Sequence, residues 1–307
     1  LTARMAQTEP DEHVKQALDF ALLEDFDHLY RYADLLEMDQ GVHAEELVGR
    51  YTEIMPARPT IAHHRWPADS VKPPIRSKKA ALVTRLHVGI ITAAEQQTMN
   101  YYMNLGNFYP SDRGRKLYTE IGMVEEQHVT HYGSLMDPAC SWLENLLLHE
   151  YTECYLYYSA VETETCPAVK KIWALHLDQE IAHLHHAAHL LETYEGKQWQ
   201  QVIPDGSFPG VLGLGPNIEY VRQVLTDTVT LTAKGEGYLP VDQLDPEDDF
   251  FRYQKLVNSP VSGVASHVVI QDAIEANGRD YRFETEEHPI PALRNRTKDN
   301  TTLGRKA

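Results

Sequence analysis

Two Glu-x-x-His pairs occur in this chain of 307 residues, Glu125 with His128 and Glu180 with His183. On a helix, residues three apart lie on one face, one turn from each other. A carboxylate and an imidazole placed in this way can together bind a divalent metal ion such as iron or manganese. One pair alone would be a weak indication, because such pairs also occur on solvated helices.

Each pair is preceded by a further glutamate at the same interval. Glu95 precedes Glu125 by as many residues as Glu150 precedes Glu180. One constant offset relates all three positions of the first set to those of the second, and it also relates Tyr102 to Tyr157. We infer a repeated helical hairpin, with a glutamate on its first helix and Glu-x-x-His on its second.

The elements that must position these residues are four consecutive helices. Apolar residues recur at helical spacing through four long segments, and Pro, Gly or capping residues mark the short breaks between them. The segments are residues 79–108, 113–136, 141–165 and 168–194. Four helices of this length with short connections are typical of an antiparallel four-helix bundle.

The glutamates fall on largely apolar helical stripes, Glu95 with Ile91 and Tyr102, and Glu150 with Leu146. An isolated carboxylate in a core is very costly, and several together require compensation. Two divalent cations would balance the four negative charges, and two neutral imidazoles would complete the ligand set. We therefore predict one dimetal centre that all four helices share.

This ligand pattern resembles the ferritin-like superfamily, and within it the rubrerythrin-type diiron proteins. The resemblance covers about residues 80–195. It implies an all-α, ferritin-like antiparallel bundle that holds two iron ions, with manganese as the other candidate. It also implies a peroxidase or oxidase reaction with hydrogen peroxide or dioxygen, supplied with electrons by an external donor.

Three further residues match rubrerythrin positions. Glu150-Tyr151-Thr152-Glu153 is similar to the rubrerythrin Glu-x-x-Glu, so the resemblance implies that Glu153 is an additional ligand of the oxidised centre. Tyr102 and Tyr158 match the tyrosines beside the metals. The chain departs from the family in lacking any Cys-x-x-Cys pair, so the rubredoxin-like electron-entry domain has no counterpart here.

Carboxylate and imidazole ligands suit iron and manganese equally well. The leading interpretation is a diiron, or dimanganese, oxidoreductase. The alternatives are an oxygenase or oxidase that acts on a small organic substrate, a dimanganese catalase, and a metal-binding protein without turnover. The residues alone do not separate these functions.

Other acidic residues and histidines are interpreted as solvated or as supporting the ligands from outside. Glu24 and His28 belong to this group because they lie outside the repeat. The same interpretation covers His131, His149, His176, His185 and His186, while His63 and His64 are expected to be structural.

The chain is expected to contain three parts. Residues 1–78 form a helical extension, with helices at 11–38 and 44–54 and a Pro-rich connector, and residues 79–200 form the bundle. Residues 201–307 are a mostly irregular extension with a helix at 218–232 and a short one at 264–276. This extension is too polar to form a large core alone, so we expect it to wrap the bundle or a partner in a homodimer.

Bulk composition excludes several classes of partner. The formal net charge of −17 disfavours binding to nucleic acid and to anionic membrane surfaces. No apolar run approaches the roughly 20 residues that a bilayer requires, and the first residues lack the apolar core of a signal peptide. Three cysteines without metal-binding spacing favour a reducing, cytoplasmic location.

Overall fold

The structure is a computed structural model that describes residues 1–52, 65–228, 230–257, 265–280 and 287–294. It is mostly helical, with one two-stranded sheet among these residues. The long helices are α2 (Glu12–Gln40), α4 (Leu82–Leu105), α5 (Asp112–Gly133), α6 (Trp142–Thr163) and α7 (Pro167–Glu195). Short 3-10 turns connect several elements, at Pro67–Ser70, Gly106–Phe108, Trp199–Gln201, Val241–Gln243 and Pro291–Leu293.

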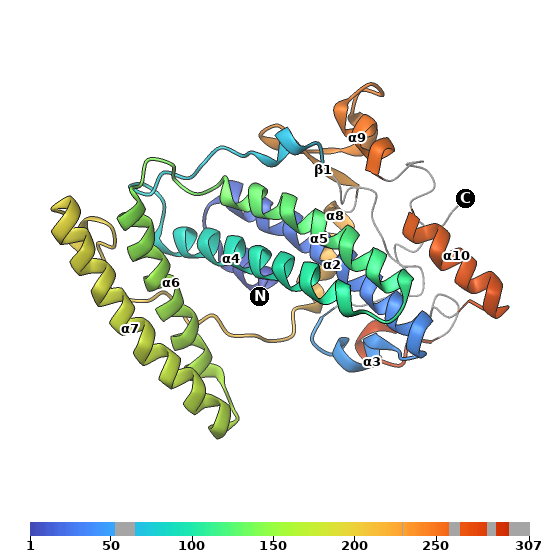
Figure 1. Ribbon diagram of the computed structural model, residues 1–307, viewed down its shortest axis with the longest axis horizontal. Coiled ribbons are helices and arrows are strands. Elements are labelled where there is room, and N and C mark those ends of the chain that lie inside the picture. The colour runs from blue at the N-terminus through green and yellow to red at the C-terminus, as the bar shows by residue number, and fades with distance from the viewer. Residues whose placement is uncertain (53–64, 229, 258–264, 281–286, 295–307) are drawn as a thin grey trace.

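Helices α2, α4 and α5 lie side by side and form the centre of the molecule (Figure 1). Asp11 caps α2 by accepting hydrogen bonds from the backbone N–H groups of His13 and Val14. The helix ends at Gly41, whose φ of 65° is left-handed, as is common for glycine after a helix. Ser111 caps α5 in the same way as Asp11 caps α2.

The short helix α1 (Thr2–Thr8) is part of this core, and its Met5 and Ala6 are buried. Glu9 follows α1 and fixes it to α4. Its carboxylate accepts a hydrogen bond from Thr84 Oγ1 at 2.6 Å and lies 2.7 Å from His87 Nδ1. The N-terminal extension therefore packs into the fold and does not lie apart from it.

Helices α6 and α7 form a second hairpin, which leaves the first at a steep angle (Figure 1). Ser141 and Glu144 form a capping box at the start of α6. The helix crosses α4 near Gly89 and Thr152, and the hairpin joins the main core through Leu147 and Leu191. Ala187 and Leu191 are the buried residues of α7, so the described parts of the chain leave most of this helix uncovered.

The C-terminal part returns to α2 and contains more regular structure than the sequence indicates. Helix α8 (Ile218–Thr228) packs on α2, and β1 (Leu231–Lys234) pairs antiparallel with β2 (Gly237–Pro240). Helices α9 (Asp249–Val257) and α10 (Ala265–Asn277) follow. In the C-terminal linker between α7 and α8, the backbone carbonyls of Ser207 and Gly210 accept hydrogen bonds from Tyr151 and Tyr155 of α6.

The expected all-α class is confirmed in this coarse sense, and the predicted long helices are present with ends shifted by a few residues. The helix expected at 218–232 ends at Thr228 and is followed by β1. The helix expected at 44–54 is shorter, and forms α3 (Ala44–Val48). Helix α9 was not expected. Residues 53–64, with His63 and His64, lie outside the described part. In the described part, no helix combines the length and the apolar character needed to cross a bilayer.

Candidate metal centre

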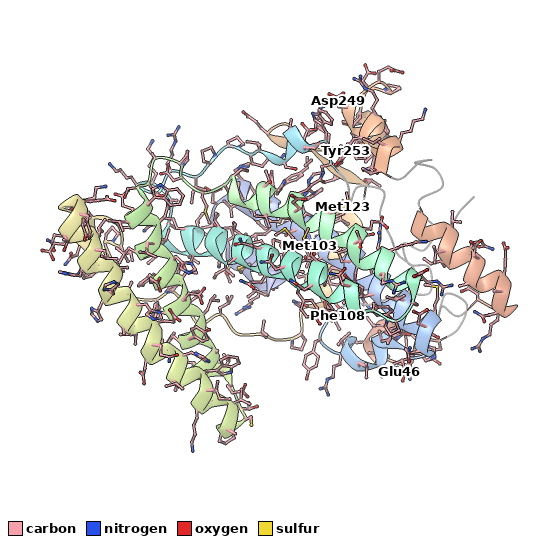
Figure 2. All side chains as sticks on the ribbon, viewed as in Figure 1. Glu46, Met103, Phe108, Met123, Asp249 and Tyr253 are labelled. Atoms are coloured by element: carbon pink, nitrogen blue, oxygen red, sulfur yellow. The ribbon has the colours of Figure 1, made fainter. Side chains whose placement is uncertain are left out.

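Three helices bring five ionisable side chains together in the protein interior: Glu24 and His28 of α2, Glu95 of α4, and Glu125 and His128 of α5. All five are at most 3% exposed. The face of α5 that carries Glu125 and His128 also carries the buried Ile121 and Val124, so it packs against α2. The opposite face of the α4–α5 hairpin carries Met103 and Met123, which are exposed (Figure 2).

Glu125 is the centre of the contacts. Its Oε1 lies 3.0 Å from Nδ1 of His28, and its Oε2 lies 2.8 Å from Nδ1 of His128. Nδ1 of His128 also lies 3.2 Å from Oε2 of Glu95, and Nε2 of the same ring lies 3.6 Å from Glu24 Oε2. The rings of His28 and His128 stack with their centroids 5.5 Å apart.

Four atoms of the cluster are buried without a hydrogen-bond partner among the described residues: both carboxylate oxygens of Glu24, Nε2 of His28 and Nε2 of His128. Leaving such groups unsatisfied costs about 1–3 kcal/mol each, and more when they are charged. A cation bound to these atoms would remove that cost. An imidazole that directs its other nitrogen to a carboxylate is also the usual arrangement of a metal-binding histidine. The residues therefore fit a divalent metal.

The pKa shifts of the buried side chains also indicate that a positive charge stabilises this cluster. Burial opposes the charged form of Glu125, but His28 and His128 lower its pKa far below the ordinary value. Burial likewise opposes the charged form of His128, yet Glu95 and Glu125 raise the pKa of this ring well above the usual range. Burial raises the pKa of Glu95 well above its usual value. The charged form of the His128 ring is thus stabilised by the carboxylates around it.

A surface pocket reaches the edge of this cluster at Asp25. Burial raises the pKa of Asp25, and the nearby charge of Glu125 raises it further. Its Oδ2 accepts a hydrogen bond from Thr2 Oγ1 at 2.9 Å. The pocket has a volume of about 470 Å³, and Leu22, Phe26 and Leu29 of α2 line it together with Asp25. Asp25 therefore lines this pocket and also interacts electrostatically with Glu125.

Tyr102, which was predicted to lie near the metals, belongs to a cluster of five tyrosines. Its ring centroid lies 5.1 Å from that of Tyr32, 5.9 Å from Tyr118 and 5.9 Å from Tyr101, and Tyr109 lies 5.4 Å from Tyr118. Burial raises the pKa of Tyr102, and the charge of Glu125 adds to this effect. The cluster extends from the carboxylates to Tyr101, which is 59% exposed.

The other predicted ligands form a second, separate group on the α6–α7 hairpin. One ligand atom from each of Glu150, Glu180 and His183 lies within 4.8 Å of the others. Nδ1 of His183 lies 2.9 Å from Glu180 Oε2 and 3.9 Å from Glu150 Oε2. The side chain of His183 is 59% exposed.

Glu153 and Tyr158 are placed outside both groups. Glu153 lines a pocket between α4 and α6 with Gln96 and His149, and burial raises its pKa. The ring of Tyr158 stacks on Phe208 of the C-terminal linker, with centroids 5.2 Å apart. The roles expected for these two residues beside a shared centre have no support from this geometry.

The expectation that Glu95, Glu125, His128, Glu150, Glu180 and His183 converge on one site is corrected by this arrangement. The physical reason is α2, which packs on the α4–α5 face that the second hairpin was expected to cover. Glu24 and His28, interpreted as solvated or supporting, are buried in the cluster. Their spacing, one turn apart on a predicted helix, is the sequence signal for this position, although both residues lie outside the repeat.

No family model matches the chain, and no curated protein or solved structure is significantly similar to it. The resemblance to rubrerythrin-type proteins therefore remains a prediction.

Proposed function

We propose that the protein is a dimetal oxidoreductase, with iron or manganese held by Glu24, His28, Glu95, Glu125 and His128, that reduces hydrogen peroxide or reacts with dioxygen. The observation that carries the proposal is the set of four buried ligand atoms on Glu24, His28 and His128 without a hydrogen-bond partner among the described residues, of which Glu24 Oε2 and His128 Nε2 face each other at 3.6 Å. Two imidazoles and three glutamates are the ligand types found in carboxylate-bridged dimetal sites, with one glutamate fewer than in the ferritin-like set.

The charges of the site agree with two divalent cations. Glu24, Asp25, Glu95 and Glu125 bring up to four negative charges into a region that also holds the buried guanidinium of Arg65. Burial opposes ionisation of Glu24, but His128 and Arg65 lower its pKa, so this carboxylate is ready to bind a cation. Because neutral imidazoles carry no charge, the negative charge of the carboxylates would be balanced by the metal ions.

A redox role is favoured by the groups around the centre. Reduction of hydrogen peroxide to two waters consumes two electrons and two protons, and two ferrous ions would supply the electrons by each becoming ferric. Asp25 lies between the pocket and the cluster, where its raised pKa suits a group that carries protons. The five tyrosines connect the cluster to the surface, where an external donor can deliver electrons.

An oxygenase that acts on a small organic substrate is the second candidate. The pocket at Asp25 favours it, because its walls include apolar side chains of α2 and its volume of about 470 Å³ suits a small molecule. The two candidates differ in what is consumed. A peroxidase needs only peroxide and a donor, whereas an oxygenase couples dioxygen use to a bound substrate.

The test is metal analysis combined with anaerobic rapid mixing. The full chain is loaded with ferrous iron and mixed with hydrogen peroxide or dioxygen while the absorbance of the oxidised centre is recorded. The proposal predicts that at least one of these oxidants oxidises the bound iron. In Glu125→Gln, it predicts loss of metal from the buried centre and loss of the reaction. His189→Ala, an exposed histidine of α7 in neither group, is the control. Full metal content in Glu125→Gln, or iron inert to both oxidants, would contradict the proposal.

A further inference from the structure

The α6–α7 hairpin repeats the ligand geometry of the α4–α5 hairpin. On α5, Nδ1 of His128 lies 2.8 Å from the glutamate of its own helix and 3.2 Å from Glu95 of the preceding helix. On α7, Nδ1 of His183 lies 2.9 Å from Glu180 and 3.9 Å from Glu150 of the preceding helix. The sequence repeat is thus a repeat of one constellation, made of two glutamates and a histidine.

The two constellations differ in what covers them. Helix α2 lies over the first and adds Glu24 and His28, so that the side chain of His128 is 0% exposed. Over the second, in the ranges that the structure describes, His183 keeps 59% of its side chain exposed, while Glu150 and Glu180 keep 15% and 17%. The second constellation is therefore half of a site with an open side.

The open side of α7 also carries apolar residues. Ile172 precedes His183 by three helical turns and Leu190 follows it by two, which places all three on one face of the helix. Ile172 and the neighbouring Leu175 are 51% and 58% exposed. An uncovered helix face that combines metal ligands with large apolar side chains is suited to packing against another helical face.

We propose that two copies of the chain join their α6–α7 hairpins about a twofold axis, forming a four-helix bundle that binds two divalent cations between them. Each copy contributes Glu150, Glu180 and His183. A glutamate from each of two helices and Glu-x-x-His from each of the other two is a complete dimetal ligand set, and one hairpin holds half of it. A twofold axis supplies the other half from an identical surface.

Charge and geometry both favour a second copy of this hairpin as the partner that packs on the open face of α7. Four glutamates brought face to face repel one another strongly unless two divalent cations, with four positive charges, lie between them. The other hairpin with matching ligands, α4–α5, cannot serve, because α2 already covers it through the 3.0 Å contact of His28 with Glu125. The ligands differ from those of the proposed function, so either site can exist without the other.

The test is sedimentation velocity of the full chain, first with chelator and then with excess Mn²⁺, together with metal analysis after gel filtration. We expect the wild-type chain to shift from monomer to dimer when Mn²⁺ is added. His183→Ala should remain a monomer and bind one Mn²⁺ fewer per chain. Because His183 is exposed, this substitution should leave the helical circular dichroism unchanged.

Two further variants distinguish metal binding at the interface from helix packing there and from metal binding at the buried centre. Ile172→Asp keeps every ligand but places a charge on the open face, so it should also remain a monomer. His128→Ala alters only the buried centre, so it should lose metal there and still dimerise with Mn²⁺. A wild-type chain that stays monomeric with Mn²⁺, or a His183→Ala variant that dimerises and binds Mn²⁺ like wild type, would overturn the inference whether or not the buried centre binds metal.

Discussion

Nδ1 of His28 lies 3.0 Å from Oε1 of Glu125, and both side chains are buried. This contact joins α2 to α5 through the centre of the candidate site, to which α2 contributes Glu24 and His28. It also accounts for the splayed second hairpin, because the face of α4–α5 that could have received α6 and α7 is occupied. Substitutions on α2 should therefore alter metal binding as well as stability.

Replacing His28 by alanine should remove metal from the buried centre. The substitution deletes a buried Nε2 available to a metal and one of the two imidazoles that hold Glu125, so we expect metal affinity to fall by at least tenfold, which corresponds to about 1.4 kcal/mol. Titration with Mn²⁺ measures this affinity. Glu24→Gln should act in the same direction, whereas equal affinities in wild type and both variants would exclude α2 from the site.

Metal binding should release protons and strengthen as the pH rises. Burial opposes protonation of His128, but Glu95 and Glu125 raise its pKa well above the ordinary value, which favours the protonated ring when no metal is bound. A metal binds the neutral imidazole and displaces that proton. Affinity should therefore increase with pH until the raised pKa is passed, and decrease as the pH falls.

Calorimetric titration in two buffers of different ionisation enthalpy counts the protons released. At least one proton per chain is expected from the buried centre at neutral pH. An apparent enthalpy that is the same in both buffers, together with an affinity that does not change between pH 6 and pH 8, would show that His128 is not a charged group displaced by the metal.

Arg31 should be essential for the docking of α2 on α5. Its Nε lies 3.0 Å from Asp27 Oδ2 and its Nη1 lies 3.0 Å from Glu120 Oε1, and its side chain is 1% exposed. Removing one partner of a buried ion pair leaves a buried charge without compensation, which costs about 3–5 kcal/mol. Arg31→Ala should lower the free energy of unfolding in urea by about that amount.

The control is Arg113→Ala, which breaks the exposed pair of Arg113 with Asp39 at 3.4 Å. Surface pairs contribute about 0–1 kcal/mol, so its unfolding midpoint should stay close to that of wild type. If the two variants unfolded at the same urea concentration, α2 would not depend on this ion pair.

Tyr102→Phe should leave the metals in place and slow the transfer of electrons to them. Burial and the charge of Glu125 raise the pKa of this phenol, and its ring packs against those of Tyr32, Tyr101 and Tyr118. Stopped-flow reduction of the oxidised centre by a one-electron donor measures the effect. Tyr194→Phe, on the exposed surface of α7, should behave like wild type. Equal rates in all three proteins would remove the tyrosines from the electron path.

The sequence was sufficient to predict the long helices and the internal geometry of each hairpin. Glu125 and His128 are one helical turn apart, so their side chains meet on one face of α5. The short turn between α4 and α5 then brings Glu95 to the same place. This group of three residues therefore follows from local structure. The same holds for Glu150, Glu180 and His183. Such contacts need only the helical period and a short connection.

The packing of one hairpin against the rest could not be predicted in this way. Either α2 or α6–α7 could cover the α4–α5 face, and both carry a glutamate and a histidine at helical spacing. The choice depends on contacts distant in sequence, such as that of Arg31 with Glu120, and on the packing of α8 against α2. Helical periodicity does not encode these contacts.

Anomalous diffraction from crystals grown with Mn²⁺ tests the central claim most directly. The account predicts two peaks about 3.5–4 Å apart among His28, Glu125 and His128, at the separation usual for dimetal sites. It also predicts that Glu24 and Glu95 turn their carboxylates to the ions. Mn²⁺ that binds elsewhere while the interior between α2, α4 and α5 shows no anomalous peak would contradict the account.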